Sequence, residues 1–169
     1  ESGRALLGAR AEEPLIGFVG SMKSWHGTEC LERVAKASGA RLVVVGDTTG
    51  KDFGPEVIQP GHLCGQELAD VVRALDVGLA PYPADAPTWF CPLKILDYRA
   101  QGTPIVASDV GDVAALVENA GSVVPVGDEA EMIRRIRFWL GEEYPGQPRP
   151  EVRVRSWRTV SREMLKEVL

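Results

Sequence analysis

Two segments of this chain carry residues that could bind an anion. The first, SMKSWHG, places Lys23, His26 and Gly27 between an apolar run that ends at Gly20 and a segment of helical period. Backbone N–H groups and the positive end of a helix dipole attract phosphate at such a junction, and glycines let a ligand approach the backbone closely. The alternative interpretation is a solvated loop with a surface lysine and an incidental histidine.

The second segment, residues 87–112, joins a loop, a helix and a following strand. Pro92 suits the first helical turn, because its missing N–H would have no partner there. Lys94 follows in the same turn, where the helix dipole disfavours a cation, and this placement indicates an anionic partner. Asp97 lies one turn further on, where its carboxylate could accept hydrogen bonds from a diol. The alternative is a solvent-exposed ion pair between Lys94 and Asp97, with a stabilisation of about 0.2–0.5 kcal/mol.

Short apolar runs alternate with segments of helical period, and these elements must position the two segments. The expected strands are residues 15–20, 42–46, 57–59, 77–81, 104–107 and 122–125. The expected helices are residues 28–38, 66–75, 92–101, 113–119 and 129–140. The runs IGFV and LVVV are apolar on both faces, which predicts a Rossmann-like α/β fold: a doubly wound parallel sheet with helices on both faces. Ligands of such sheets bind beyond the carboxyl ends of the strands, so both segments are expected at that edge.

The ends of the chain differ in composition from its middle. Residues 1–14 are expected to be a connection from a longer protein, since ESGRALLGARAEE has no initiator methionine and no signal-peptide pattern. Residues 15–140 form the expected Rossmann-like domain, residues 141–153 an exposed connection and residues 154–169 a last helix. The apolar positions of that helix recur at spacings of three and four and should dock on another surface. They are Trp157, Val160, Met164, Leu165 and Val168.

Composition excludes several classes of protein. The 169 residues are 44% hydrophobic and 25% charged, the proportions of an ordinary globular domain with one core. A net charge of −5 argues against nucleic acid as a partner. Three widely spaced cysteines without a CxxC pair indicate free thiols in a reducing compartment, so a cytoplasmic location is expected. No apolar run is long enough to cross a bilayer, and neither histidine has a zinc-ligand spacing, so no metal site is expected.

Three catalytic or nucleotide-binding motifs are missing or incomplete. The first strand leads into GFVGSMKSWHG rather than GxGxxG, which removes the main support for a nicotinamide or flavin enzyme. The run GDTTGKD is one residue short of a Walker A loop and has Asp52 where a Ser or Thr would hold magnesium, so a turn built from Gly46, Asp47 and Gly50 is expected there. The GxSxG elbow of serine hydrolases is absent, and no strand end offers the acceptor aspartate of a response regulator.

Four ordered blocks resemble the C-terminal, donor-binding half of the family-four nucleotide-sugar glycosyltransferases (glycosyl transferases group 1), which have the two-domain GT-B fold. The first two are IGFVGSMKSWHG, like the family's first strand and phosphate loop, and GQELADVVRALDVGLAPY, like its fourth-strand unit. The third, CPLKILDYRAQGTPIVASDVG, is similar to the family signature SPLKxxEYMAxGxPVVAS and is the most specific. The closing segments VGDEAEMIRRIRFWL and SWRTVSREMLKEVL form the fourth.

The resemblance implies transfer of a sugar from a UDP- or GDP-linked donor to an acceptor hydroxyl, with retention of the anomeric configuration. It implies that Lys23 and Lys94 stabilise the leaving diphosphate, that Asp97 holds the ribose hydroxyls, and that no metal or other cofactor is obligatory. The implied donor-binding residues are Gly20, Ser21, Lys23, His26, Cys91, Pro92, Leu93, Lys94 and Asp97. An N-terminal GT-B domain, absent from these residues, would carry most of the acceptor site and any membrane association, so this part alone is expected to bind donor without turnover.

The sequence also departs from the family pattern. Trp89 stands at the first acid of the E-x7-E pair, Asp97 replaces the second, and Cys91 replaces a serine. Asp112 and Ala115 replace a glycine and a glutamate. Two alternatives follow: a catalytically degenerate domain that only binds nucleotide or protein, and a sugar-nucleotide epimerase or phosphorylase with the same fold.

Overall fold

A six-stranded parallel sheet forms the centre of the computed structural model, which describes residues 2–87, 89, 91–141, 149, 150, 162 and 166. The strands are β1 Leu15–Val19, β2 Arg41–Val45, β3 Ile58–Gly61, β4 Val77–Ala80, β5 Ile105–Ser108 and β6 Gly121–Val124. Their order across the sheet is β3-β2-β1-β4-β5-β6, so the direction of strand addition reverses between β1 and β4. The predicted doubly wound parallel sheet is confirmed.

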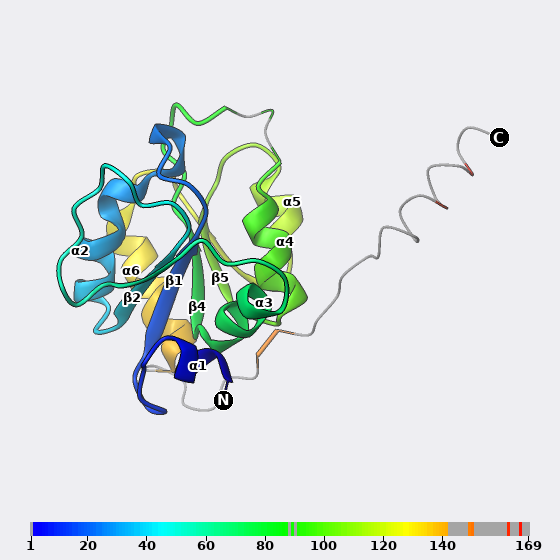
Figure 1. Ribbon diagram of the computed structural model, residues 1–169. Helices are drawn as coiled ribbons and strands as arrows, with labels where there is room; N and C mark the ends of the chain where they lie inside the picture. The colour runs from blue at the N-terminus through cyan, green and yellow to red at the C-terminus, as the bar shows by residue number, and fades with distance from the viewer. Residues whose placement is uncertain are drawn as a thin grey trace.

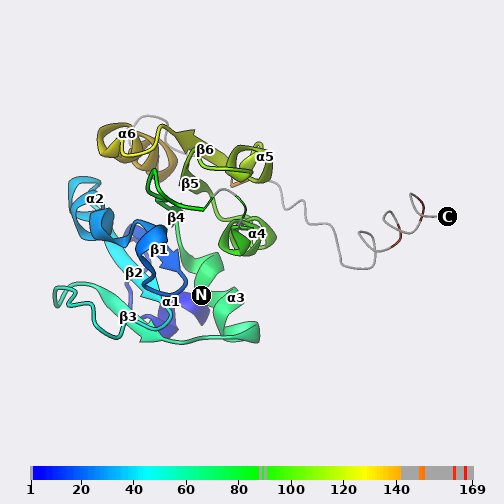
Figure 2. The ribbon, with the colours of Figure 1, turned by 90° about the horizontal axis from the view of Figure 1, so that it is seen from above.

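Helices cover both faces of the sheet (Figure 1; Figure 2). On one face lie α2 Leu31–Ala37 and α6 Glu129–Leu140. On the other lie α3 Gly65–Ala74, α4 Leu93–Ala100 and α5 Val113–Val117. All five were predicted, but the helix expected over residues 28–38 starts at Leu31, because two 3-10 turns, Ser24–His26 and Thr28–Cys30, precede it.

A short helix, α1 Ser2–Leu6, stands where the sequence predicts only a connection. It packs against α3, and a Cβ on its Gly3 would lie 1.9 Å from the carbonyl oxygen of Asp70. Leu7, directly after the helix, is 6% exposed and joins the core. This close backbone approach needs glycine, and a five-residue element has too little hydrophobic period to be read from the sequence.

The core has two layers because successive side chains of a strand point to opposite faces. Leu15 and Val43 pack with α3, α4 and α5, whereas Ile16 and Leu42 pack with α2 and α6. Gly17 follows Ile16 in β1 and faces the same side as Leu15, where a Cβ would come within 2.3 Å of the Leu75 side chain. Both faces are therefore buried, which is why these strands read as continuous apolar runs.

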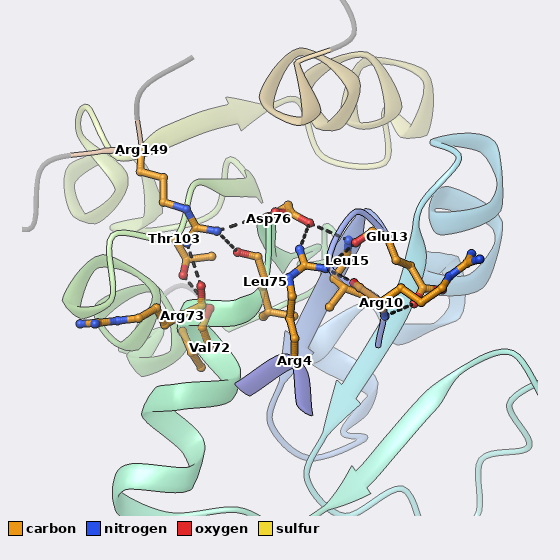
Figure 3. A network of polar contacts seen from close by, with 10 residues as sticks. All are labelled: Arg4, Arg10, Glu13, Leu15, Val72, Arg73, Leu75, Asp76, Thr103 and Arg149. Carbon is orange, nitrogen blue, oxygen red and sulfur yellow. Dashed lines mark hydrogen bonds and ion pairs between the residues drawn. The ribbon is translucent and has the colours of Figure 1, made fainter. Parts of the chain in front are cut away.

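A polar network around Asp76 lies at the amino edge of the sheet (Figure 3). Its Oδ2 accepts hydrogen bonds from the Arg4 guanidinium and from the backbone N–H of Leu15, each at 2.8 Å. Arg149 donates to the carbonyl oxygen of Leu75 at 3.1 Å and lies 3.7 Å from Asp76 Oδ1. One carboxylate thereby joins the segment before β1, the start of β1, the start of β4 and a residue after α6.

Part of the predicted tail lies outside the described residues. This holds for the expected last helix, residues 154–169, apart from residues 162 and 166, and for its apolar stripe from Trp157 to Val168. The expected connection, residues 141–153, is described only at residues 141, 149 and 150. Within the described part, no helix combines the length and the apolar character that a membrane crossing requires, and the three cysteines are free thiols.

Replacing Asp76 with alanine is expected to lower the free energy of unfolding by about 1–3 kcal/mol, because the Leu15 N–H at the buried start of β1 would lose its acceptor. Urea denaturation followed by circular dichroism measures this loss. Glu131→Gln is the matched control, since Glu131 also binds two arginines, Arg134 and Arg135, each at 2.7 Å, but both of them lie on its own helix, α6. Equal midpoints for the Asp76 variant and the wild type would show that the network contributes nothing to stability.

Candidate functional site

Both segments that could bind an anion lie at the carboxyl edge of the sheet, where the strand order reverses. The first leaves β1 at Gly20, whose N–H donates to the carbonyl oxygen of Val45 at 2.9 Å. The second lies between β4 and α4. A Cβ on Gly20 would lie 3.4 Å from Lys94 Cε, so the fold brings the ends of the two segments into contact. Strand-order reversal is where doubly wound sheets bind their ligands.

Lys94 is a buried cation without a carboxylate partner. It is 8% exposed, and none of the described residues forms an ion pair with it. Its Nζ lies 4.6 Å from the centre of the Phe18 ring and 4.9 Å from that of Tyr82, and it donates to Tyr82 Oη at 3.4 Å. Burial lowers the pKa of Lys94 to about 8. Because two ring faces compensate only part of the cost of burying an ammonium group, the site favours an anionic ligand.

The alternative of an exposed ion pair between Lys94 and Asp97 is wrong. Lys94 turns inward from α4, whereas Asp97, one turn later, lies exposed. Desolvation raises the pKa of the Asp97 carboxyl, and none of the described residues donates a hydrogen bond to it. Its acceptor oxygens are therefore free for a ligand.

The loop after β1 places His26 beside the same two rings. The His26 ring centre lies 5.9 Å from that of Phe18 and 6.3 Å from that of Tyr82. Its Nδ1 lies 2.6 Å from the Ser21 carbonyl oxygen, so Nδ1 carries the proton and Nε2 accepts hydrogen bonds. Burial lowers the pKa of His26. The hydrogen bond to Ser21 raises this pKa, and the charge of Lys94 lowers it again. The imidazole is therefore neutral at neutral pH.

Gly27 holds this loop against the end of β4. Its φ is +61°, in the left-handed region, and a Cβ there would lie 1.6 Å from the carbonyl oxygen of Pro81. No other residue could occupy the position without moving the loop. Lys23, in the middle of the loop, is exposed. The Thr49 hydrogen bonds lower the pKa of Asp47, and the charge of Lys23 adds a smaller effect in the same direction.

The GDTTGKD segment forms the predicted turn. Asp47 Oδ1 accepts a hydrogen bond from the N–H of Thr49 at 2.9 Å, and Gly50 has a φ of +81°. A Cβ on Gly46 would lie 2.2 Å from the Gly20 carbonyl oxygen. The glycines serve chain reversal and the close approach of the ends of β1 and β2, and no phosphate loop is formed.

The start of α4 offers less to an anion than the sequence suggests. Pro92 is buried and lies just before the helix rather than in its first turn, while Cys91 and Leu93 are exposed. The N–H of Leu93 already donates to the Cys91 carbonyl oxygen at 2.9 Å, and that of Ile95 to the Pro92 carbonyl oxygen at 3.0 Å. The cation of Lys94, rather than free backbone N–H groups, is therefore the main attraction for a phosphate here.

Sequence reasoning missed the aromatic residues that enclose the lysine. Phe18 and Tyr82 are 0% and 1% exposed and come from β1 and from the segment after β4. A third buried aromatic residue, Tyr98, lies four residues after Lys94 in α4. The spacing of Lys94 and Tyr98 is a signal in the sequence, since residues four apart share a helix face, but the contacts of Phe18 and Tyr82 depend on the sheet.

A cavity of larger size than a single side chain lies elsewhere, away from this site. It has a volume of about 990 Å³ at the amino edge and is lined by residues that include Glu13, Arg41, Glu32 and Lys36. Glu13 and Arg41 are paired with each other at 3.5 Å, and Glu32 accepts the N–H of Gly54 at 2.9 Å. Ligands of doubly wound sheets bind beyond the carboxyl ends of the strands rather than at the amino ends, so this cavity is not the candidate site. Within the described ranges, no group of three His, Cys, Asp or Glu side chains is arranged to hold a metal ion.

Comparison with known sequences places the chain among sugar-transferring proteins. Residues 13–142 match the family described as "Glycosyl transferases group 1". The chain is 31% identical over 132 residues to a GDP-mannose-dependent alpha-mannosyltransferase of Corynebacterium glutamicum, covering 75% of this chain and 31% of the relative. It is 28% identical over 162 residues to a protein of the same name from Mycobacterium tuberculosis, covering 90% and 42%. The chain thus spans less than half the length of these relatives.

Solved structures show the same fold. Sucrose-phosphate synthase from Thermosynechococcus elongatus superposes with a TM-score of 0.71 at 22% identity, covering 99% of this chain and 47% of the other. The Anabaena protein HepE, in complex with UDP-glucose, superposes with a TM-score of 0.66 at 17% identity, covering 98% and 50%.

The buried ammonium of Lys94 has a consequence for stability that needs no ligand. The pKa of Lys94 falls from 10.5 to about 8 on folding, so between these values the unfolded chain binds more protons and stability rises with pH. Lys94→Met is therefore expected to be more stable than the wild type at pH 7, with a difference that shrinks from about pH 8 to pH 10. Urea denaturation of both proteins at pH 7 and pH 10 measures this difference in stability.

Lys36→Met is the matched control, because Lys36 is an exposed lysine on α2. It should leave the pH dependence of the wild type unchanged. Parallel stability curves for the wild type and Lys94→Met would contradict the prediction.

Proposed function

This chain belongs to the family of group 1 glycosyl transferases, and on that premise we propose that its carboxyl-edge site binds the nucleoside-diphosphate-sugar donor of a glycosyltransferase. The buried, unpaired ammonium of Lys94 carries the proposal. A donor diphosphate is an anion of the right chemistry for such a group. The relatives are more than twice as long as the part of them that this chain matches. The sugar transfer itself is therefore proposed for a protein of the relatives' length.

The proposed mechanism is electrostatic stabilisation of the leaving diphosphate. As the bond between the sugar and the diphosphate breaks, negative charge grows on the phosphate oxygens. Lys94, held by the Phe18 and Tyr82 rings, is already in place, so it stabilises this growing charge more than the ground state. The exposed Lys23 adds a second, more mobile cation. Neutral His26 accepts a hydrogen bond through Nε2 from a donor hydroxyl.

The donor is proposed to be a GDP- or UDP-linked sugar, with GDP-mannose the first to test. Two relatives, at 31% and 28% identity, are named for GDP-mannose. From the resemblance to family-four enzymes we also propose that the transfer retains the anomeric configuration. NMR of the product of the full-length protein measures this configuration. For this chain alone, donor binding without turnover is expected.

Thermal unfolding of the chain with GDP, UDP, ADP or NAD, and with the matching nucleosides, tests the donor site. At roughly 100 times its dissociation constant, a ligand that binds only the folded chain raises the midpoint by about 5–10 °C. A shift with GDP or UDP but not with NAD or the nucleosides supports the proposal. No shift with any of them would overturn it and favour the degenerate domain.

Lys94→Ala is expected to weaken GDP or UDP binding by roughly 10- to 100-fold, the value of a charge-assisted hydrogen bond, while changing nucleoside binding much less. Isothermal titration calorimetry of each ligand measures the two effects. Lys36→Ala, an exposed lysine at the opposite edge, serves as the control. Equal weakening of diphosphate and nucleoside would exclude a diphosphate contact.

Asp97→Asn is expected to reduce the preference for ribose over 2′-deoxyribose nucleotides, since an amide accepts fewer hydrogen bonds from a diol than a carboxylate. The ratio of the dissociation constants of GDP and dGDP, or of UDP and dUDP, measures it. Glu12→Gln is the control, because Glu12 is an exposed carboxylate at the amino edge of the sheet, and it should leave the ratio unchanged. Unchanged discrimination by the Asp97 variant would remove Asp97 from the ribose contact.

A further inference from the structure

Strands β1 and β4 separate before either of them ends. β1 pairs with β2 through five residues, from Leu15 to Val19, but its register with β4 stops at Gly17 and Gly78. β4 meanwhile continues beside β5 as far as Ala80. Each strand thus keeps its outer neighbour while losing its inner one, and the last backbone groups that face the gap need other partners.

The Tyr98 hydroxyl fills this gap. Tyr98 is 0% exposed, and its Oη accepts a hydrogen bond from the N–H of Val19 at 3.0 Å. The same oxygen lies 3.1 Å from the Leu79 carbonyl oxygen and 3.3 Å from that of Gly17, either of which takes its single proton. One side-chain hydroxyl thereby replaces the missing ladder between β1 and β4.

The ring of Tyr98 reaches the gap because of a glycine in β4. A Cβ on Gly78 would lie 2.7 Å from three carbons of the Tyr98 ring. Gly78 has no positive φ, so close approach rather than backbone conformation requires glycine here. The tyrosine and the glycine form a matched pair.

We propose that Tyr98 is a positioning residue that sets the separation between the two halves of the donor site. This rests on the proposed function. Tyr98 is four residues after Lys94 in α4, and its hydroxyl binds the end of β1, one residue before the loop from Gly20 to Gly27. It therefore joins the helix that carries Lys94 and Asp97 to the loop that carries Lys23 and His26. A diphosphate that contacts both halves requires this spacing, since small misplacements of binding groups weaken binding strongly.

Tyr98→Phe tests the proposal because it keeps the ring against Gly78 and removes only the hydroxyl. Titration calorimetry with GDP and UDP is expected to show binding about tenfold weaker than that of the wild type. In the Lys94→Ala background the same substitution should cost less than about twofold, because a diphosphate that no longer contacts the α4 half does not depend on the separation of the two halves. An equal loss in both backgrounds would overturn the proposal.

Thr103→Val is the matched control. Thr103 is 0% exposed and its hydroxyl donates to the Val72 carbonyl oxygen at 2.7 Å, but it follows α4 at the amino edge of the sheet. Both variants remove a buried hydroxyl that donates to a backbone carbonyl, and Tyr98→Phe also removes the acceptor of the Val19 N–H. A fall in thermal midpoint in both variants, with a loss of binding only in Tyr98→Phe, supports positioning. An equal loss of binding in both variants would mean general loosening and overturn it.

Gly78→Ala reaches the same contact from the other strand. Its Cβ must displace the Tyr98 ring, so binding of GDP or UDP is expected to weaken at least as much as in Tyr98→Phe. Wild-type affinity in a folded Gly78→Ala chain would contradict the proposal. Failure of the wild-type chain itself to bind GDP or UDP would instead overturn the proposed function, and the positioning role with it.

Discussion

The early separation of β1 and β4 is the constraint on which the carboxyl edge depends. The two strands are neighbours in the sheet, yet the helices that follow them, α2 and α4, cover opposite faces. The two strands must therefore diverge there. The divergence leaves backbone groups without strand partners at a place that water cannot reach. Tyr98 resolves the conflict with one hydroxyl, and Gly78 makes room for its ring. Buried hydrogen bonds of the Tyr98 hydroxyl thus fix the gap between β1 and β4.

The electrostatics of this edge follow from the same geometry. α4 brings Lys94 across the end of the sheet to Phe18, whose ring belongs to the core layer of the opposite face, and to Tyr82. The cation is surrounded by aromatic carbon, and no described carboxylate neutralises it. Such an arrangement costs stability in the free chain and is tolerated at functional sites, where a ligand supplies the missing charge. Burial is the main cause of the lowered pKa of His26, and the charge of Lys94 lowers it further.

The two edges of the sheet differ in how their buried and half-buried charges are paired. At the amino edge Asp76 binds Arg4, Arg149 and the N–H of Leu15, which come from segments far apart in the sequence, so its charge is paired within the chain. At the carboxyl edge Lys94 and Asp97 lack such partners among the described residues. A buried cation without an ion partner, at the point where the strand order reverses, distinguishes the candidate site from the amino-edge cavity.

The sequence by itself determined the class of fold, nearly every strand and helix in the described part, and the two segments that meet at the site. It could do so because alternating apolar periods dictate secondary structure locally, and short parallel strands with helical crossovers have few ways to assemble. The segment SMKSWHG and the Lys94 helix were identified from residue type and spacing alone. The short helix α1 was not, because it is defined by a backbone contact of Gly3 with Asp70. Only the tertiary structure decided that Lys94 is buried while Asp97 is exposed, and that Tyr98 and Gly78 meet across the gap beside β1. Burial and contact between distant residues depend on how the sheet twists and where its strands part, and no local pattern encodes this.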